Sequence, residues 1–392
     1  MTIQIAEAVA VEPIVERCRH LAEDLSLQAV EEWKARHPGG RAVGCYPVYC
    51  PVELIHAAGM LPVGVLGGGN QVEIAHADAR FQSFICSIVK STLELGLTGR
   101  LQVLDGMIFH SICDPARNLA SVFVRNFPHQ VVEYIHFPQN LASPRAVHYL
   151  AAEYRRVLAS LESLAGRPAT AADLSESIQV YNRSRALIRA LYRLRAQRPE
   201  CLATAELYPL VRAGTVLPPE EHAALMEDAL HAVEQRAARP KDRIRVVVEG
   251  SFCEQPPLEL VSALEEAGCY LVDDDFLLGW RWFVDDVPVE DGDPVRGLAR
   301  AYVDGAVHCA TRHDLRLPKT AHLLEKVRDL QADAVIFLAA KFCEPALFDY
   351  VLVRRALEEA GIPHVFLEFE EKMWNFEKMR TEVETFVESM LF

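Results

Sequence analysis

The chain has 392 residues, of which 51% are apolar and 24% charged, and its 40 Lys and Arg against 55 Asp and Glu give a formal net charge of −15. A chain of this length folds as about two or three domains, and its acidic balance excludes a general affinity for nucleic acid or anionic lipid. No apolar run reaches the ~18 residues of a membrane span, and the first residues lack the features of a signal peptide, so we expect a cytoplasmic protein.

Short apolar runs alternate with amphipathic stretches after a helical segment over residues 1–40, which is typical of α/β folds. The alternation predicts a first α/β lobe over residues 41–143. Its predicted strands are Ala42–Val48, Leu61–Leu66, Val103–Phe109 and Val131–His136, and its predicted helices are Pro51–Ala58, Phe81–Leu95 and Pro115–Asn126.

Residues 144–240 follow a different pattern, because apolar side chains recur there at three- and four-residue steps. This pattern predicts an all-helical insert. The α/β alternation returns over residues 241–392 and predicts a second lobe with a C-terminal helix. The fold class is therefore α/β, with two doubly wound, Rossmann- or flavodoxin-like lobes joined by helices. The predicted strands of the second lobe are Arg243–Glu249, Cys269–Val272, Ala334–Leu338 and His364–Phe369, and its predicted helices are Pro257–Ala267, His322–Leu330, Pro345–Ala360 and Phe376–Met390.

Three of the ten cysteines follow predicted strands in similar local sequences. They are Cys113 in SICDP, Cys253 in SFCEQPP and Cys343 in KFCEP, and each is expected to open a helix. Ligands bind at the carboxyl ends of parallel strands, and a helix N-terminus favours the thiolate, which is the form that binds metal. The pattern thus suggests a metal or cluster site, although a lone cysteine is more often a small buried apolar residue. Cys86 is expected inside or at the start of its helix.

The remaining motifs are less specific. The GGGN sequence at Gly67–Asn70 lacks the GxGxxG pattern, and no Walker sequence occurs, so no nucleotide site is predicted. Asp273–Asp275 follows a strand and suits either a hard cation or a solvated turn. Glu53 and His56 lie three residues apart on one short helix, so they share a side of it. They could act as acid or base, or form a helix cap with a satisfied histidine.

Several longer segments together resemble the benzoyl-CoA reductase/2-hydroxyacyl-CoA dehydratase family. The similarity runs from about Trp33 to the C-terminus, with the motifs in the same order. Within the family, two blocks most resemble the C-type (gamma) subunits of class I, ATP-dependent benzoyl-CoA reductases. The segments are YCPVELIHAAGMLPVGVLGG, FICSIVKSTLELGL, DGMIFHSICDPARNL, GSFCEQPPLELVSALEEAGCYLVDDD and KFCEPALFDYVLVRRALEEAGIPH.

The resemblance implies a [4Fe-4S] cluster held by Cys86, Cys113 and Cys343, which leaves one iron without a protein thiolate. Cys253 is the alternative ligand or a neighbouring thiol, and Cys50 has no assigned role. The implied activity is reduction of the aromatic ring of benzoyl-CoA, or a close analogue, to a cyclic dienoyl-CoA by low-potential one-electron steps in an anaerobic pathway of aromatic degradation. Glu53 and His56 are then candidate proton donors.

The resemblance also implies partners. It places the chain in a heterotetramer with a homologous cluster-bearing sister subunit and two ATPase/activator iron–sulfur subunits, with reduced ferredoxin as the electron donor. The cluster could contact the substrate or relay electrons to the sister subunit. Two alternatives stay open: a subunit of a 2-hydroxyacyl-CoA dehydratase that uses a ketyl radical, and a non-catalytic acyl-CoA-binding partner.

Overall fold

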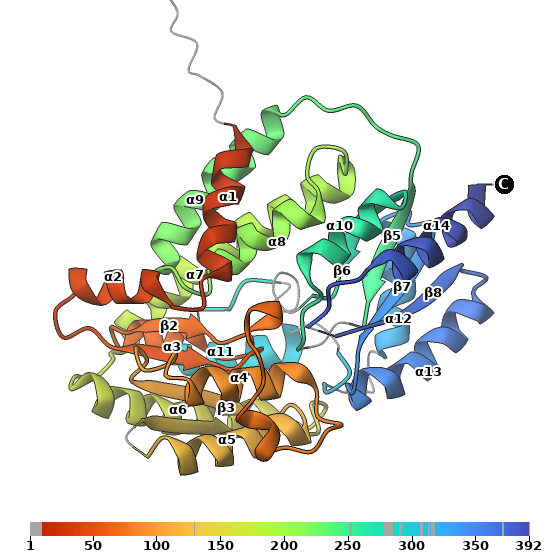
Figure 1. The fold of residues 1–392 in the computed structure, drawn as a ribbon. Helices are drawn as coiled ribbons and strands as arrows, with labels where there is room; N and C mark the ends of the chain where they lie inside the picture. The colour runs from red at the N-terminus through yellow and green to blue at the C-terminus, as the bar shows by residue number, and fades with distance from the viewer. Residues whose placement is uncertain are drawn as a thin grey trace, which may run out of the picture.

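Two four-stranded parallel sheets form the framework of the protein, shown at the lower left and at the right of the ribbon in Figure 1. The computed structural model describes residues 10–128, 130–250, 253–276, 285–289, 292–305, 309–312, 314, 318–370 and 372–391. Each sheet belongs to its own lobe, which confirms the predicted α/β class with two doubly wound lobes.

The first lobe is built on a sheet with the strand order β2-β1-β3-β4. The predicted strands are present but shorter than expected, and the helix predicted from Phe81 begins only at Ser87. Helix α5 packs against β3 and β4, and α3 packs against β2; β3 is completely buried, whereas β4, at the edge of the sheet, is only partly buried. The elements are β1 (Ala42–Cys45), α3 (Val52–Ala57), β2 (Leu61–Gly64), α4 (Ser87–Leu97), β3 (Gly106–His110), α5 (Asp114–Asn126) and β4 (Val131–Ile135).

The second lobe has the equivalent strand order, β6-β5-β7-β8. Helices α10 and α14 bury side chains against one face of this sheet, and α12 and α13 bury theirs against the other. Alternate residues of β5 therefore point into two separate cores. The elements are β5 (Ile244–Glu249), α10 (Leu258–Glu266), β6 (Cys269–Asp274), α12 (Lys319–Asp329), β7 (Ala334–Ala340), α13 (Glu344–Glu359), β8 (His364–Phe369) and α14 (Glu377–Leu391).

Helices from three parts of the sequence complete the molecule. In Figure 1, α1 crosses α8 and α9 above the first lobe. Helix α7 starts with a capping box, in which Thr170 and Asp173 bond each other's backbone N–H groups. Two helices, α8 and α11, were not predicted. The elements are α1 (Val11–Glu23), α2 (Gln28–Arg36), α6 (Ala146–Ala165), α7 (Ala171–Gln197), α8 (Thr204–Ala213), α9 (Pro219–Gln235) and α11 (Pro294–Arg300).

Polar contacts connect the two lobes with each other and the second lobe with helix α7. Asn70, in the glycine-rich loop of the first lobe, donates to Met373 O at 2.6 Å and accepts from Met373 N at 2.8 Å. In α7, Arg195 contacts Asp274 of β6 at 2.9 Å, and both side chains are 1% exposed.

The described helices include none with the length and apolar character needed to cross a membrane.

Candidate functional site

Cys86, Cys113 and Cys343 occupy equivalent positions, because each is the residue that immediately precedes a helix. These helices are α4, α5 and α13. Cys113 and Cys343 also follow the carboxyl ends of β3 and β7, as predicted. All three side chains line a single pocket, which we call the cysteine pocket. The structure therefore brings the three sequence-predicted thiols together from distant parts of the chain.

The cysteine pocket is formed by both lobes. Cys86 and Cys113 come from the first lobe, while Cys343 and the further thiol Cys253 come from the second. The pocket contains about 1430 Å³ of space not filled by protein atoms, part of it open to solvent. Its rim carries three well exposed aromatic side chains, those of Phe84, Phe342 and Phe348.

Burial dominates the electrostatics of Cys86 and Cys113. It raises the pKa of Cys113 to about 11, and it raises the pKa of Cys86 well above the usual range, with further contributions from Glu254, Cys113 and Cys343. The helix N-terminus is expected to favour the thiolate of Cys113, but burial has the larger effect on the pKa of this thiol. Desolvation outweighs the helix dipole here. A bound metal would reverse the balance, because it ligates the thiolate directly.

The donor set of the cysteine pocket fits an iron–sulfur cluster, since thiolates are the usual ligands of such clusters. Among the described residues, no group of three or more His, Cys, Asp or Glu side chains is placed closely enough to hold a single metal ion. A cluster of several irons is larger than one ion and requires thiols that are farther apart. The three thiols around one pocket are consistent with that requirement.

Cys253 lines the cysteine pocket but does not open a helix, so this part of the prediction is wrong. Helix α10 begins at Leu258, with Pro257 as its N-cap. The pair Pro256–Pro257 explains the delay, because proline disfavours a helical conformation in the residue before it. Cys253 is 8% exposed. Its role as an alternative ligand stays open.

Glu254 is a site residue that the sequence analysis missed. Its side chain is 2% exposed and lies in the wall of the cysteine pocket. Its carboxylate accepts hydrogen bonds from Ser87 Oγ at 2.5 Å and from Ile88 N at 3.3 Å, in the first turn of α4. A signal was present in the sequence, because an acidic residue follows each of the three strand-end cysteines. Only the fold shows that this one reaches across to the other lobe.

Glu53 and His56 both lie in α3, and neither lines the cysteine pocket. Glu53 is fully buried and forms an ion pair with Arg185, while its Oε2 has no hydrogen-bond partner among the described residues. His56 contacts Ser177 Oγ at 3.0 Å through Nδ1 and Glu220 Oε1 at 3.4 Å through Nε2. These contacts fasten α3 to α7 and α9. The predicted role of both residues as proton donors stays a prediction.

Asp273–Asp275 is neither a solvated turn nor an open cation site, because basic side chains already occupy it. Asp273 contacts Lys326 at 3.4 Å, and Asp275 contacts Lys319 at 3.6 Å. Asp274 forms the ion pair with Arg195 described above. Burial raises the pKa of Asp273 to about 6, with Lys326 acting in the opposite direction. The three carboxylates thus belong to a buried charge network, in which Lys319 and Lys326 also contact Glu249.

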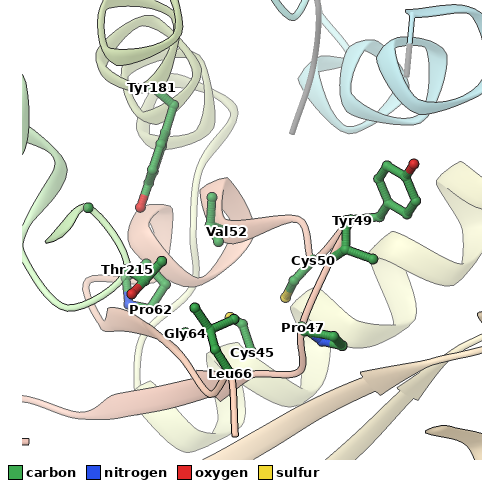
Figure 2. Close-up of a pocket in the computed structure, with 12 residues that line it drawn as sticks. Cys45, Pro47, Tyr49, Cys50, Val52, Pro62, Gly64, Leu66, Tyr181 and Thr215 are labelled. Carbon is green, nitrogen blue, oxygen red and sulfur yellow. The ribbon is translucent and has the colours of Figure 1, made fainter. Parts of the chain in front are cut away.

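Cys50 lines a different pocket from the one that holds the three cysteines. This second pocket, which we call the Cys45–Cys50 pocket, lies between the end of β1 and the start of α3, with Tyr181 of α7 and Thr215 on its far side (Figure 2). Its wall is otherwise mainly apolar. The segment between the two cysteines also contributes Tyr46 to the cysteine pocket. One short segment thus forms part of both pockets.

Comparison with known proteins identifies the family of this chain. The chain belongs to the family described as 2-hydroxyglutaryl-CoA dehydratase, D-component, whose profile matches residues 47–390. It is 40% identical to the C subunit of benzoyl-CoA reductase from Thauera aromatica, over 96% of this chain and 98% of that protein. It is 30% identical to the beta subunit of lactoyl-CoA dehydratase from Anaerotignum propionicum, over 97% and 99% of the two chains. The resemblance to this reductase and dehydratase family is confirmed.

Proposed function

We propose that this chain is an iron–sulfur subunit of an ATP-dependent, ferredoxin-linked benzoyl-CoA reductase. The enzyme reduces the aromatic ring of benzoyl-CoA, or of a close analogue, to a cyclic dienoyl-CoA. The observation that carries the proposal is the convergence of Cys86, Cys113 and Cys343 on one pocket, in a chain 40% identical to a benzoyl-CoA reductase subunit. The identity extends over nearly the whole of both chains.

Cys86, Cys113 and Cys343 would hold a [4Fe-4S] cluster, which supplies electrons at the very negative potential that an aromatic ring requires. The thiolates are supported by the starts of three helices, where backbone N–H groups point toward the pocket and stabilise negative charge. Glu254 holds the first turn of α4 and so positions Cys86. The aromatic side chains on the rim offer an apolar approach for an aromatic acyl group.

The proposal requires partners because the chain lacks a nucleotide-binding motif of its own. We infer that it works with a homologous cluster-bearing sister subunit and with two ATPase subunits that accept electrons from reduced ferredoxin. Both relatives are named as single subunits of their enzymes, which supports an assembly of unlike chains.

A second candidate function is a subunit of a 2-hydroxyacyl-CoA dehydratase. The 30% identity to a lactoyl-CoA dehydratase subunit favours it over an unrelated activity. Both reactions begin with a low-potential electron, so the same cluster framework serves either. The third possibility, a non-catalytic acyl-CoA-binding partner, would not need the three thiols.

The test is to purify the chain anaerobically with its partners, separate it and measure iron and acid-labile sulfide per chain. The proposal predicts about four of each, as in a [4Fe-4S] protein. The complete assembly, given ATP and reduced ferredoxin, should form a dienoyl-CoA from benzoyl-CoA. Dehydration of a 2-hydroxyacyl-CoA instead would assign the second function. A chain that contains neither iron nor sulfide would be a binding partner.

A further inference from the structure

Cys45 and Cys50 form a pair of thiols that the proposed function does not use. Cys45 is the last residue of β1, and Cys50 lies two residues before α3. Between them, Tyr49 adopts a left-handed conformation with φ +62°, and both cysteines line the same pocket. Each side chain is 4% exposed. The pair is thus held by a strand end and by the residues that lead into α3.

Both thiols face the Cys45–Cys50 pocket, and Cys45 is close enough to add to the burial that raises the pKa of the Cys50 thiol (Figure 2). Cys45 Sγ has a further weak contact with Val43 O at 3.9 Å. The pocket beside them contains about 480 Å³ of space not filled by protein atoms, part of it open to solvent. Both sulfur atoms therefore border one common space beside the end of β1 and the start of α3.

We propose that Cys45 and Cys50 are an oxidisable dithiol that closes to an intrachain disulfide when the chain meets an organic disulfide. One thiolate attacks a sulfur of the reagent, forming a mixed disulfide and releasing one reagent thiol. The second protein thiolate then attacks the protein sulfur and releases the other reagent thiol. The protein loses two protons and two electrons, and the reagent is reduced to two thiols. This inference is independent of the proposed function.

Closure would also act on the neighbouring pocket. Tyr46, within the closed loop, lines the cysteine pocket, and its N–H donates to Ile108 O at 3.0 Å. A bond between residues 45 and 50 fixes the short segment that both pockets share. Burial raises the pKa of Cys50 well above its usual range, so the thiolate is scarce at neutral pH and closure is slow.

The experiment treats the full folded chain with 4,4′-dithiodipyridine, a small aromatic disulfide, under anaerobic conditions. The chain is then denatured, alkylated with iodoacetamide and digested with trypsin. The peptide Ala42–Arg80 contains only the two cysteines of the pair, and Ala196–Arg212 contains only the buried Cys201. We expect the first peptide to be two hydrogens lighter than its dithiol form and unalkylated, until a reductant restores both alkylation sites. Cys201 should remain alkylated as a free thiol.

Two variants test whether the closure is intrachain. In Cys45→Ser and Cys50→Ser, the remaining cysteine should carry one pyridylthio group or be alkylated as a free thiol, and the disulfide should be absent. The same reagent applied to the wild-type chain in urea shows whether the peptide can close at all. The proposal is overturned if the folded wild-type peptide carries two separate alkyl or pyridylthio groups while the unfolded chain forms the disulfide. The wild-type result does not depend on whether either variant folds.

Discussion

Glu254 Oε1 accepts a hydrogen bond from Ser87 Oγ at 2.5 Å, across the boundary between the two lobes. Ser87 follows Cys86 directly, and Glu254 follows Cys253, so the contact joins the neighbours of two thiols of the cysteine pocket. A carboxylate at the first turn of a helix satisfies free backbone N–H groups and interacts favourably with the helix dipole. The contact therefore both joins the lobes and positions the start of α4.

Replacing Glu254 should destabilise the contact between the two lobes. We expect Glu254→Ala to lower the free energy of unfolding by about 2–3 kcal/mol, because it removes buried hydrogen bonds to a charged group. Urea denaturation of the full chain measures the effect. Glu259→Gln, on the exposed side of α10, is the matched control, with an expected change below about 0.5 kcal/mol. Equal effects in the two variants would contradict a specific role for Glu254.

Removal of a ligand thiol should remove the proposed cluster and leave the fold intact. Cys113→Ser is expected to lose most of its iron and sulfide while retaining its circular dichroism spectrum. Cys253→Ser should retain both elements, and Cys201→Ser, far from the pocket in sequence, serves as the control. Loss of iron in Cys253→Ser with full iron in Cys113→Ser would mean that Cys253 is the ligand in place of Cys113.

His110 should make the stability of the chain depend on pH. It is fully buried, neither ring nitrogen has a hydrogen-bond partner in the described part of the chain, and burial lowers its pKa to about 3. The unfolded state, with a histidine pKa of about 6.5, binds the proton first as pH falls, so this contribution to stability is lost below pH 6.5. The loss reaches about 2 kcal/mol at pH 5 at about 1.4 kcal/mol per pH unit.

His110→Phe removes this titration and the unpaired nitrogens. We expect the variant to lose about 2 kcal/mol less unfolding free energy than the wild type between pH 7 and pH 5. Urea denaturation at the two pH values gives the comparison. A variant with the same pH dependence as the wild type would show that other groups control acid stability.

Removing only one partner of the Arg195–Asp274 ion pair should strongly lower the free energy of unfolding. Arg195→Met is expected to lower the unfolding free energy by about 3–5 kcal/mol, because it leaves a buried carboxylate without its arginine. The double variant with Asp274→Leu should recover much of this loss. Arg183→Met is the control, because it breaks a surface ion pair in which the side chains of Arg183 and Glu227 are 62% and 38% exposed. It should lower the free energy of unfolding by less than about 1 kcal/mol.

Most strands and helices could be predicted because each depends on a local pattern of apolar residues. β7 is a continuous apolar run, and α7 repeats apolar residues with helical spacing, so each element was predicted close to its observed place. Helix α8 was missed because it contains Pro209 and is only 10 residues long. Its position depends on packing against α1 and α9, which no local pattern encodes.

The candidate site was predictable only in part, because its contacts join residues far apart in the sequence. The pattern of a strand, a cysteine and an acidic residue selected Cys113, Cys253 and Cys343 equally, and only the family resemblance added Cys86. No local sequence pattern indicates that Asp274 forms an ion pair with Arg195. Local proline chemistry, by contrast, could have shown that no helix opens at Cys253.

The origin of the three thiols has a consequence for how the protein matures. Cys86 and Cys113 belong to the first lobe and Cys343 to the second, so the complete ligand set exists only after both lobes have folded and met. A cofactor that needs all three thiols would therefore be retained only by correctly assembled chains. Under the proposed function, the iron content of a preparation would measure the fraction of chains in which both lobes have folded correctly.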